Sequence, residues 1–91
     1  MTRDEALETI KAVIEEVVPG ADLAGVSPHE NFREHLEMDS LDFLNFVEVL
    51  SARTGLALPE QDYPSLTTLE GCADYVATRS RGTKEDPPRT A

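Results

Sequence analysis

Apolar side chains recur at intervals of three and four residues in three separate segments of this 91-residue chain: residues 2–18, 39–54 and 68–79. That interval matches the helical repeat, so each segment is predicted to form a helix with one buried face. No segment alternates apolar and polar residues as a half-buried strand would. We therefore predict an all-α fold, a small bundle of three main helices. The predicted buried faces are Leu7, Ile10, Ile14, Val17 and Val18; Phe43, Phe46, Val47 and Leu50; and Leu69, Cys72, Ala73 and Val76.

Capping and breaking residues set the predicted helix ends. Thr2 opens a capping-box pattern, and Pro19 with Gly20 ends the first helix. Gly55 is the expected C-terminal stop of the second helix. A fourth, short helix is expected over residues 60–63, ending before Pro64.

The connection over residues 19–38 is long for so small a domain, and such loops are often functional. It is too apolar to be a free linker, because it carries Leu23, Val26, Phe32 and Leu36. We expect an ordered loop held to the core by those side chains.

Residues 1–80 are predicted to form one domain, and the polar, proline-bearing residues 81–91 a disordered tail. Cys72 is the sole cysteine, so an internal disulfide is excluded and a buried, inert thiol is expected. The N-terminus has no apolar core of a signal peptide, and no apolar run reaches the ~20 residues that span a bilayer. A cytoplasmic location is therefore expected.

The chain is strongly acidic, with 18 Asp and Glu against 8 Lys and Arg and a formal charge of −10. Such a surface repels nucleic acids and anionic membranes. It suits association with basic patches on other proteins, because opposite charges steer the encounter.

The segment from Leu36 to Asp42 is the most informative for function. Asp39 is expected to cap the second helix while the Asp42 side chain reaches back to it. This arrangement leaves the hydroxyl of Ser40 pointing to solvent at the first helical position. A phosphate attached there would lie beside unpaired backbone amides at the positive end of the helix, a favourable site for an anion.

The solvent face of the same helix carries large aliphatic side chains. At about 100° per residue, Leu41 lies almost opposite the buried face, flanked by Leu44 and Val49. An exposed leucine next to a serine and two carboxylates has the character of a docking surface, although single exposed apolar residues are common.

Other classes of site are poorly supported. Ser40, His35 and Asp39 are close in sequence, but nothing supplies an oxyanion hole or a pocket that excludes water, so no enzyme is predicted. His29 and His35 lie in a polar loop and are expected to be exposed. With one distant cysteine, they lack the ligand spacing of a zinc site, and no calcium-binding loop is present.

The triplet Asp39-Ser40-Leu41 resembles the Asp-Ser-Leu motif of acyl carrier proteins, in which the serine carries 4′-phosphopantetheine. The resemblance continues without gaps from Leu36 to Val76, and the first helix and long loop agree in length. The further residues that fit the family are Asp42, Leu44, Val47, Leu50, Pro59, Leu66-Thr67-Thr68-Leu69 and Asp74-Tyr75-Val76.

The resemblance implies that a phosphopantetheinyl transferase moves the arm from coenzyme A to Ser40. A monomeric carrier would then take acyl groups, as thioesters on the arm, between acyl-loading and acyl-processing enzymes with basic docking patches. Residues expected at the recognition surface are Asp39, Leu41, Asp42, Leu44 and Glu48. Residues that could line a sheltered acyl chain, besides packing the core, are Phe32, Leu36, Phe43, Phe46, Val47, Leu66 and Cys72.

Three features depart from the family pattern. Glu37 stands where glycine is usual, so the turn before the helix could differ in backbone conformation. Asn45 stands at a position that is generally acidic in the family, and Glu48 at one that is often apolar. Residues 51–53 stand where an acidic cluster is common. These changes favour a specialised fatty-acid, polyketide or other secondary pathway over housekeeping fatty-acid synthesis.

Two alternatives stay open. One is a peptidyl or aminoacyl carrier. Carriers of that class resemble a Gly-Gly-x-Ser pattern before the serine, and Met38-Asp39 argues against it here. The other is a helical protein-interaction module without a cofactor, which explains the charge and Leu41 but not the long downstream match.

Overall fold

The computed structural model describes the backbone of residues 1–85 and the side chains of residues 1–80. Three long α-helices form the bundle: α1 (Arg3–Val17), α3 (Ser40–Thr54) and α4 (Leu69–Glu85). A 3₁₀ helix, η2 (Glu60–Leu66), packs against α4 and supplies the shorter fourth element. Among the residues described there is no β-strand, and Asn31 and Thr68 form a single isolated bridge. The all-α prediction is confirmed.

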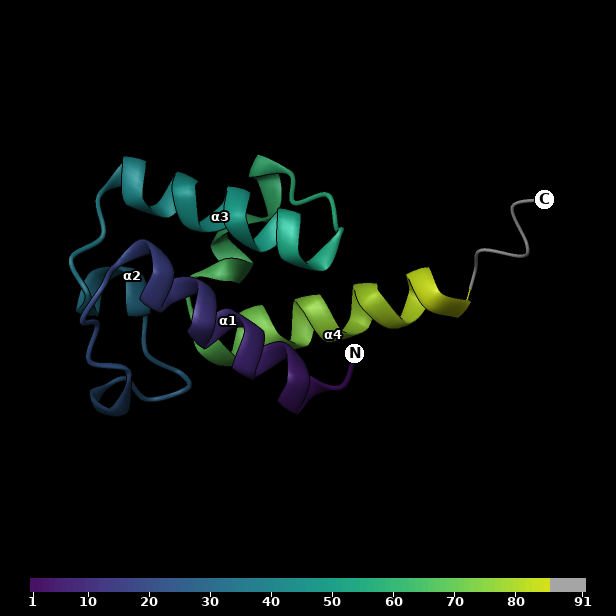
Figure 1. Cartoon of the computed structure of the whole chain (residues 1–91), viewed down its shortest axis with the longest axis horizontal. Helices are drawn as coiled ribbons and strands as arrows, with labels where there is room; N and C mark the ends of the chain where they lie inside the picture. The colour runs from purple at the N-terminus through teal and green to yellow at the C-terminus, as the bar shows by residue number, and fades with distance from the viewer. Residues whose placement is uncertain (86–91) are drawn as a thin grey trace.

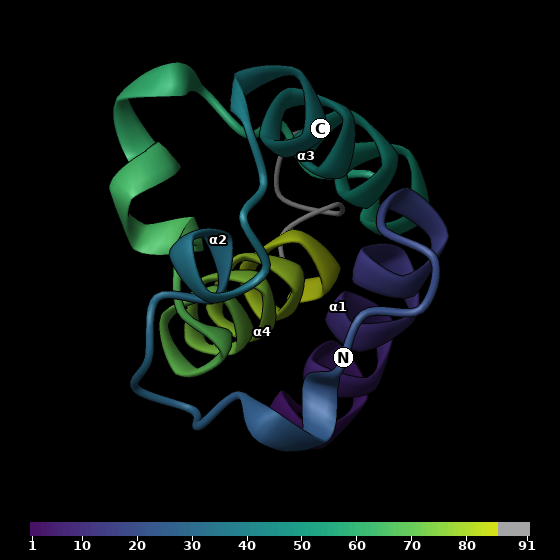
Figure 2. The ribbon, with the colours of Figure 1, turned by 90° about the vertical axis from the view of Figure 1, so that its left-hand side faces the viewer.

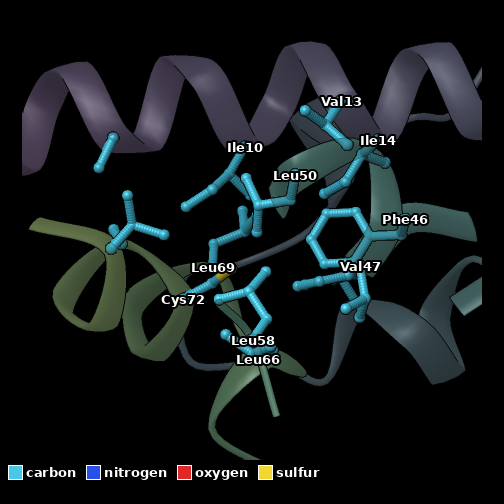
Figure 3. Close-up of a cluster of buried hydrophobic side chains, with 14 of the residues drawn as sticks. Ile10, Val13, Ile14, Phe46, Val47, Leu50, Leu58, Leu66, Leu69 and Cys72 are labelled. Carbon is cyan, nitrogen blue, oxygen red and sulfur yellow. The ribbon is translucent and has the colours of Figure 1, made fainter. Parts of the chain in front are cut away.

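Helix α1 packs against both α3 and α4, and the view along the bundle shows these helices and η2 arranged around one core (Figures 1 and 2). Side chains from α1, α3, η2 and α4 converge there (Figure 3). The predicted buried faces of α3 and α4 are confirmed. The α1 face is shifted from the prediction. Its fully buried residues are Ala6, Ile10, Val13 and Ile14, while Leu7, Val17 and Val18 are only partly buried.

The ends of α1 and α3 follow the capping chemistry. Thr2 and Glu5 form the complete capping box, with the Thr2 amide 2.8 Å from Glu5 Oε1 and the Glu5 amide 3.1 Å from Thr2 Oγ1. Gly55 ends α3 with a φ of 73°, a left-handed conformation that glycine adopts readily. Both predicted boundaries are confirmed.

Two helix ends differ from the prediction. Helix η2 continues through Pro64 to Leu66. The fixed φ of proline suits a 3₁₀ helix, and the missing N–H of Pro64 removes only one hydrogen-bond donor. Helix α4 extends to Glu85 rather than stopping near Arg79. Gly82 weakens a helix by about 1 kcal/mol relative to alanine without preventing it. Of the tail predicted to be disordered, residues 86–91 lie outside the described part of the chain.

The long connection between α1 and α3 is ordered as expected, but it contains two short helices, η1 (Leu23–Gly25) and α2 (Phe32–His35). Val26 and Phe32 are buried, whereas Leu23 and Leu36 are partly buried. Backbone hydrogen bonds also tie the connection to the start of α4: the Phe32 amide donates to Thr67 O (2.9 Å) and the Glu70 amide to Pro28 O (3.0 Å). These contacts hold α2 and the segment before it against the start of α4.

Candidate functional site

Ser40 is the first residue of α3, and its side chain is exposed. The residue before it, Asp39, is the N-cap, and Asp39 Oδ1 accepts a hydrogen bond from the Asp42 amide at 2.8 Å. The capping role therefore belongs to Asp39 and leaves the hydroxyl of Ser40 available. Both features agree with the sequence-based prediction.

One detail of the predicted cap is wrong. The Asp42 side chain makes no return hydrogen bond to the Asp39 amide, unlike Glu5, which returns one to Thr2. Aspartate is one methylene shorter than glutamate and so has less reach. The Asp42 carboxylate is left partly exposed beside Ser40, where it can act on an approaching partner.

A charged group that the sequence did not point to, the guanidinium of Arg33, lies beside the Ser40 hydroxyl. Arg33 Nη2 lies 3.5 Å from Ser40 Oγ, longer than a normal hydrogen bond. The guanidinium carbon of Arg33 lies 4.8 Å from the centre of the Phe43 ring, a cation–π contact. Arg33 and Phe43, together with Ser40, Leu44, Glu60 and Tyr63, line a cavity of about 280 Å³.

Sequence spacing gave no sign of this contact. Arg33 precedes Ser40 by seven residues and lies on a separate four-residue helix. The tight turn between α2 and α3 brings the two together, with the Met38 amide donating to Arg33 O at 2.9 Å. In that turn Met38 is buried and Glu37 has a φ of 55°.

Glu37, which stands where the family usually has glycine, keeps the backbone conformation that glycine favours. Its positive φ lies in the left-handed region that favours glycine and costs other residues roughly 1–2 kcal/mol. The turn thus retains a backbone suited to glycine, with a glutamate accommodated in it.

The outer face of α3 is apolar near Ser40, as the helical-wheel argument predicts. Leu41 is 77% exposed and Leu44 43% exposed, and among residues 1–80 these are the two exposed large hydrophobic side chains. Asn45 and Glu48 are also exposed, while Val49 is partly buried. The outer face of α3 beside the hydroxyl is therefore aliphatic and acidic.

Comparison with known proteins shows which family has a helix start of this kind. A family model described as "Phosphopantetheine attachment site" matches residues 8–76. The acyl carrier protein of Rubrobacter xylanophilus is 36% identical over 76 residues, which cover 84% of this chain and 93% of that protein.

The chain belongs to the acyl carrier protein family.

Other relatives are more distant. The acyl carrier protein of Thermosynechococcus vestitus is 29% identical over 84% of this chain and 93% of its own. The meromycolate extension acyl carrier protein of Mycobacterium leprae is 26% identical over 84% of this chain and 65% of its own. No solved structure matches the chain.

Acyl carrier proteins carry acyl groups on a covalently attached 4′-phosphopantetheine arm, and they are carriers, not catalysts. They interact with phosphopantetheinyl transferases and with acyl-processing enzymes. The family membership weighs against the cofactor-free module that the sequence left open. The residues around Ser40 fit the arm, because an exposed hydroxyl without a capping role lies next to a guanidinium.

The residues expected to line an acyl chain lie in the core between the helices. Phe32, Phe46, Leu66 and Cys72 are fully buried, and Leu36 is only partly buried. Three aromatic contacts run from the core toward Ser40: Phe32–Phe46 at 5.4 Å, Phe46–Phe43 at 5.9 Å and Phe43–Tyr63 at 5.5 Å between ring centres.

The remaining candidate reactive groups, Cys72, His29 and His35, make no hydrogen bond to the Ser40 hydroxyl. Cys72 is buried as predicted, and this burial raises the pKa of its thiol to about 12. His29 and His35 are exposed as expected, and each has its Nδ1 close to a glutamate, Glu70 at 2.7 Å and Glu30 at 2.6 Å. Within the described residues, no three His, Cys, Asp or Glu side chains are grouped to hold a metal ion, and no helix is long and apolar enough to cross a membrane.

Proposed function

We propose that Ser40 is the residue that takes the 4′-phosphopantetheine arm. The observation that carries this proposal is the exposed hydroxyl at the first position of α3, next to an Asp39 that performs the capping itself. The Asp39-Ser40-Leu41 triplet resembles the family motif and lies inside the region matched by the family model.

In this proposal the chain supplies a nucleophile and the transferase supplies the catalysis. Ser40 Oγ forms a new bond to the phosphorus of coenzyme A that bears the pantetheine. The bond from that phosphorus to the nucleotide part breaks, and adenosine 3′,5′-bisphosphate leaves. The serine proton passes to a base of the transferase. The Ser40 hydroxyl is exposed and open to the reaction, because Asp39 and not Ser40 caps the helix.

Intact mass spectrometry tests the attachment. After incubation with coenzyme A and a transferase of broad specificity, the wild-type chain should gain the mass of one phosphopantetheine. Ser40→Ala should gain nothing. The matched control is Ser27→Ala, which removes another exposed serine hydroxyl and should be modified as fast as the wild type. Modification of Ser40→Ala would overturn the assignment.

Partner enzymes are proposed to recognise the face of α3 around Ser40. Its exposed leucines, Leu41 and Leu44, supply apolar contact, and the carboxylates of Asp39, Asp42 and Glu48 supply charge for basic patches. Asp42→Lys should slow modification by the transferase at low salt, and the difference should shrink at high salt because exposed charges are screened. Equal rates for the wild type and the variant in both conditions would contradict this role of Asp42.

The carrier is further proposed to serve a specialised pathway rather than general fatty-acid synthesis. The support is the altered outer surface of α3: Asn45 and Glu48 are exposed, and Arg53 pairs with Glu16 of α1. A relative named as a meromycolate extension carrier is compatible with this reading. In a competition assay, a fatty-acid synthesis enzyme should prefer its own carrier, loaded with the same acyl group, over this one. Equal use of the two carriers would contradict the proposal.

A sheltered acyl chain is proposed to enter the core past Phe43. Of the seven predicted lining residues, Phe43 is the one that both lines the cavity beside Ser40 and contacts Phe46 in the core. Loading a medium-length acyl group should shift the NMR signals of Phe46 and Leu66 relative to the unacylated arm. Unchanged core signals would mean that the chain stays outside.

The carrier domain itself is proposed to comprise residues 1–80, since the buried hydrophobic side chains run from Ala6 to Ala77. A chain ending at Ser80 should be loaded at the same rate as the full chain. Loss of loading on truncation would assign residues 81–91 a role in the domain. The cytoplasmic location expected from the sequence stays a prediction.

A further inference from the structure

Arg33 stands out among the arginines because no carboxylate lies within ion-pair distance of it in the described part of the chain. This is unusual in a protein with a formal charge of −10. Each of the other arginines with a described side chain pairs with an acidic residue: Arg3 with Asp74, Arg53 with Glu16 and Arg79 with Asp62.

The guanidinium is held in place by a ring rather than by a counter-ion. It lies over Phe43, 4.8 Å from the ring centre, and Phe43 is itself buried against Tyr63. The backbone of Arg33 is fixed at the same time, because its carbonyl accepts a hydrogen bond from the Met38 amide in the turn before α3. Arg33 therefore presents its N–H donors beside Ser40 in a set direction, with the nearest atom 3.5 Å from Ser40 Oγ.

Modification of Ser40 would change the charge at this point. A phosphodiester bonded to Ser40 Oγ adds a negative charge next to Asp39 and Asp42, and like charges at short range are unfavourable. Glu60, which lines the same cavity, adds a further carboxylate. A guanidinium can offset this repulsion, because its planar array of donors matches the oxygens of a phosphate and forms charge-assisted hydrogen bonds.

We propose that Arg33 is a positioning residue that binds the phosphodiester of the arm and fixes where the arm leaves Ser40. The bound guanidinium places the start of the arm beside the cavity lined by Phe43, Leu44 and Tyr63. This inference rests on the proposed attachment at Ser40. It adds a residue of α2 to a site whose hydroxyl lies on α3.

NMR of the apo and holo forms of the full chain tests the inference. Loading is first established by intact mass. In the wild type, the Arg33 Nε–H signal should shift on loading, and the ³¹P signal of the arm should differ from that of the same phosphodiester in the denatured holo-protein. In holo Arg33→Gln the ³¹P signal should move toward the value in the denatured holo-protein. Arg33→Lys should give an intermediate shift, because it keeps the charge without the planar fork.

Arg53→Gln is the matched control, since it removes one arginine at the opposite end of α3 and should leave the ³¹P signal unchanged. If the chain is loaded but neither the Arg33 signal nor the ³¹P signal responds as described, the inference is wrong and the attachment stands. If the chain gains no arm, the attachment proposal fails, and the inference fails with it. The wild-type comparison decides the matter even if Arg33→Gln does not fold.

Discussion

Asp39 and Asp42 are joined by a hydrogen bond in which the Asp42 amide donates to Asp39 Oδ1 at 2.8 Å. This bond starts α3 and keeps the intervening Ser40 out of the cap. One aspartate thus combines a structural role with a position on the proposed docking surface, and the two roles can be separated by substitution.

Asp39→Ala should lower the free energy of unfolding by about 1 kcal/mol, because it removes the N-cap of a long helix. Asp39→Asn keeps a good cap without the charge, so it should retain stability while slowing modification by the transferase. Urea unfolding and a loading assay measure the two effects. Equal loss of stability in both variants would show that charge, rather than the cap, is what Asp39 contributes.

Glu37→Gly should stabilise the protein by about 0.5–1 kcal/mol. Glycine relieves the left-handed strain at φ 55°, and part of that gain is offset by its larger entropy in the unfolded chain. Glu34→Gly, an exposed substitution in the neighbouring right-handed helix α2, is the control and should destabilise. Thermal unfolding of both variants measures the difference, and destabilisation by Glu37→Gly would contradict the strain.

Stability should fall at acid pH partly through Glu30. Hydrogen bonds from His35 and from the Ser27 amide hold the pKa of Glu30 below its ordinary value. A lowered pKa in the folded state stabilises the fold above the unfolded value, about 4.3, and the contribution is lost as the pH falls through the folded pKa.

The stability difference between wild type and Glu30→Gln should therefore be largest near neutral pH and shrink on acidification. Unfolding titrations across that range measure it. A difference that does not change with pH would show that the Glu30 charge is not involved.

The sole cysteine offers a direct readout of the arm. Cys72 is fully buried with its pKa raised to about 12, so the native apo-protein should show no fast-reacting thiol to a thiol reagent. The loaded protein should show one, the terminal thiol of the arm. Rapid labelling of the folded apo-protein would contradict the burial, and denaturation should expose Cys72 in both forms.

Local chemistry explains which parts of the fold could be predicted. The caps at Thr2 and Asp39 and the stop at Gly55 depend on neighbouring residues alone, so the sequence places α1 and α3 within a residue. The end of α4 could not be placed, because Gly82 weakens a helix without fixing where it stops. The burial of Val13 was missed since it depends on how α1 packs against α3 and α4.

The candidate site divides in the same way. Ser40, Leu41 and Asp39 lie on one helix start, and their exposure follows from helical spacing. Arg33 could not be found by that means, because its approach to Ser40 depends on the turn through Glu37 and on the ring of Phe43. Contacts made across a turn are tertiary, and a single sequence carries no periodic signal for them.

Tandem mass spectrometry of the loaded protein tests most directly whether Ser40 carries the arm. Fragment ions should place one phosphopantetheine on Ser40, within the segment Met38-Asp39-Ser40-Leu41. A modification mapped to any other residue, or a loaded chain whose Ser40 is unmodified, would contradict the account.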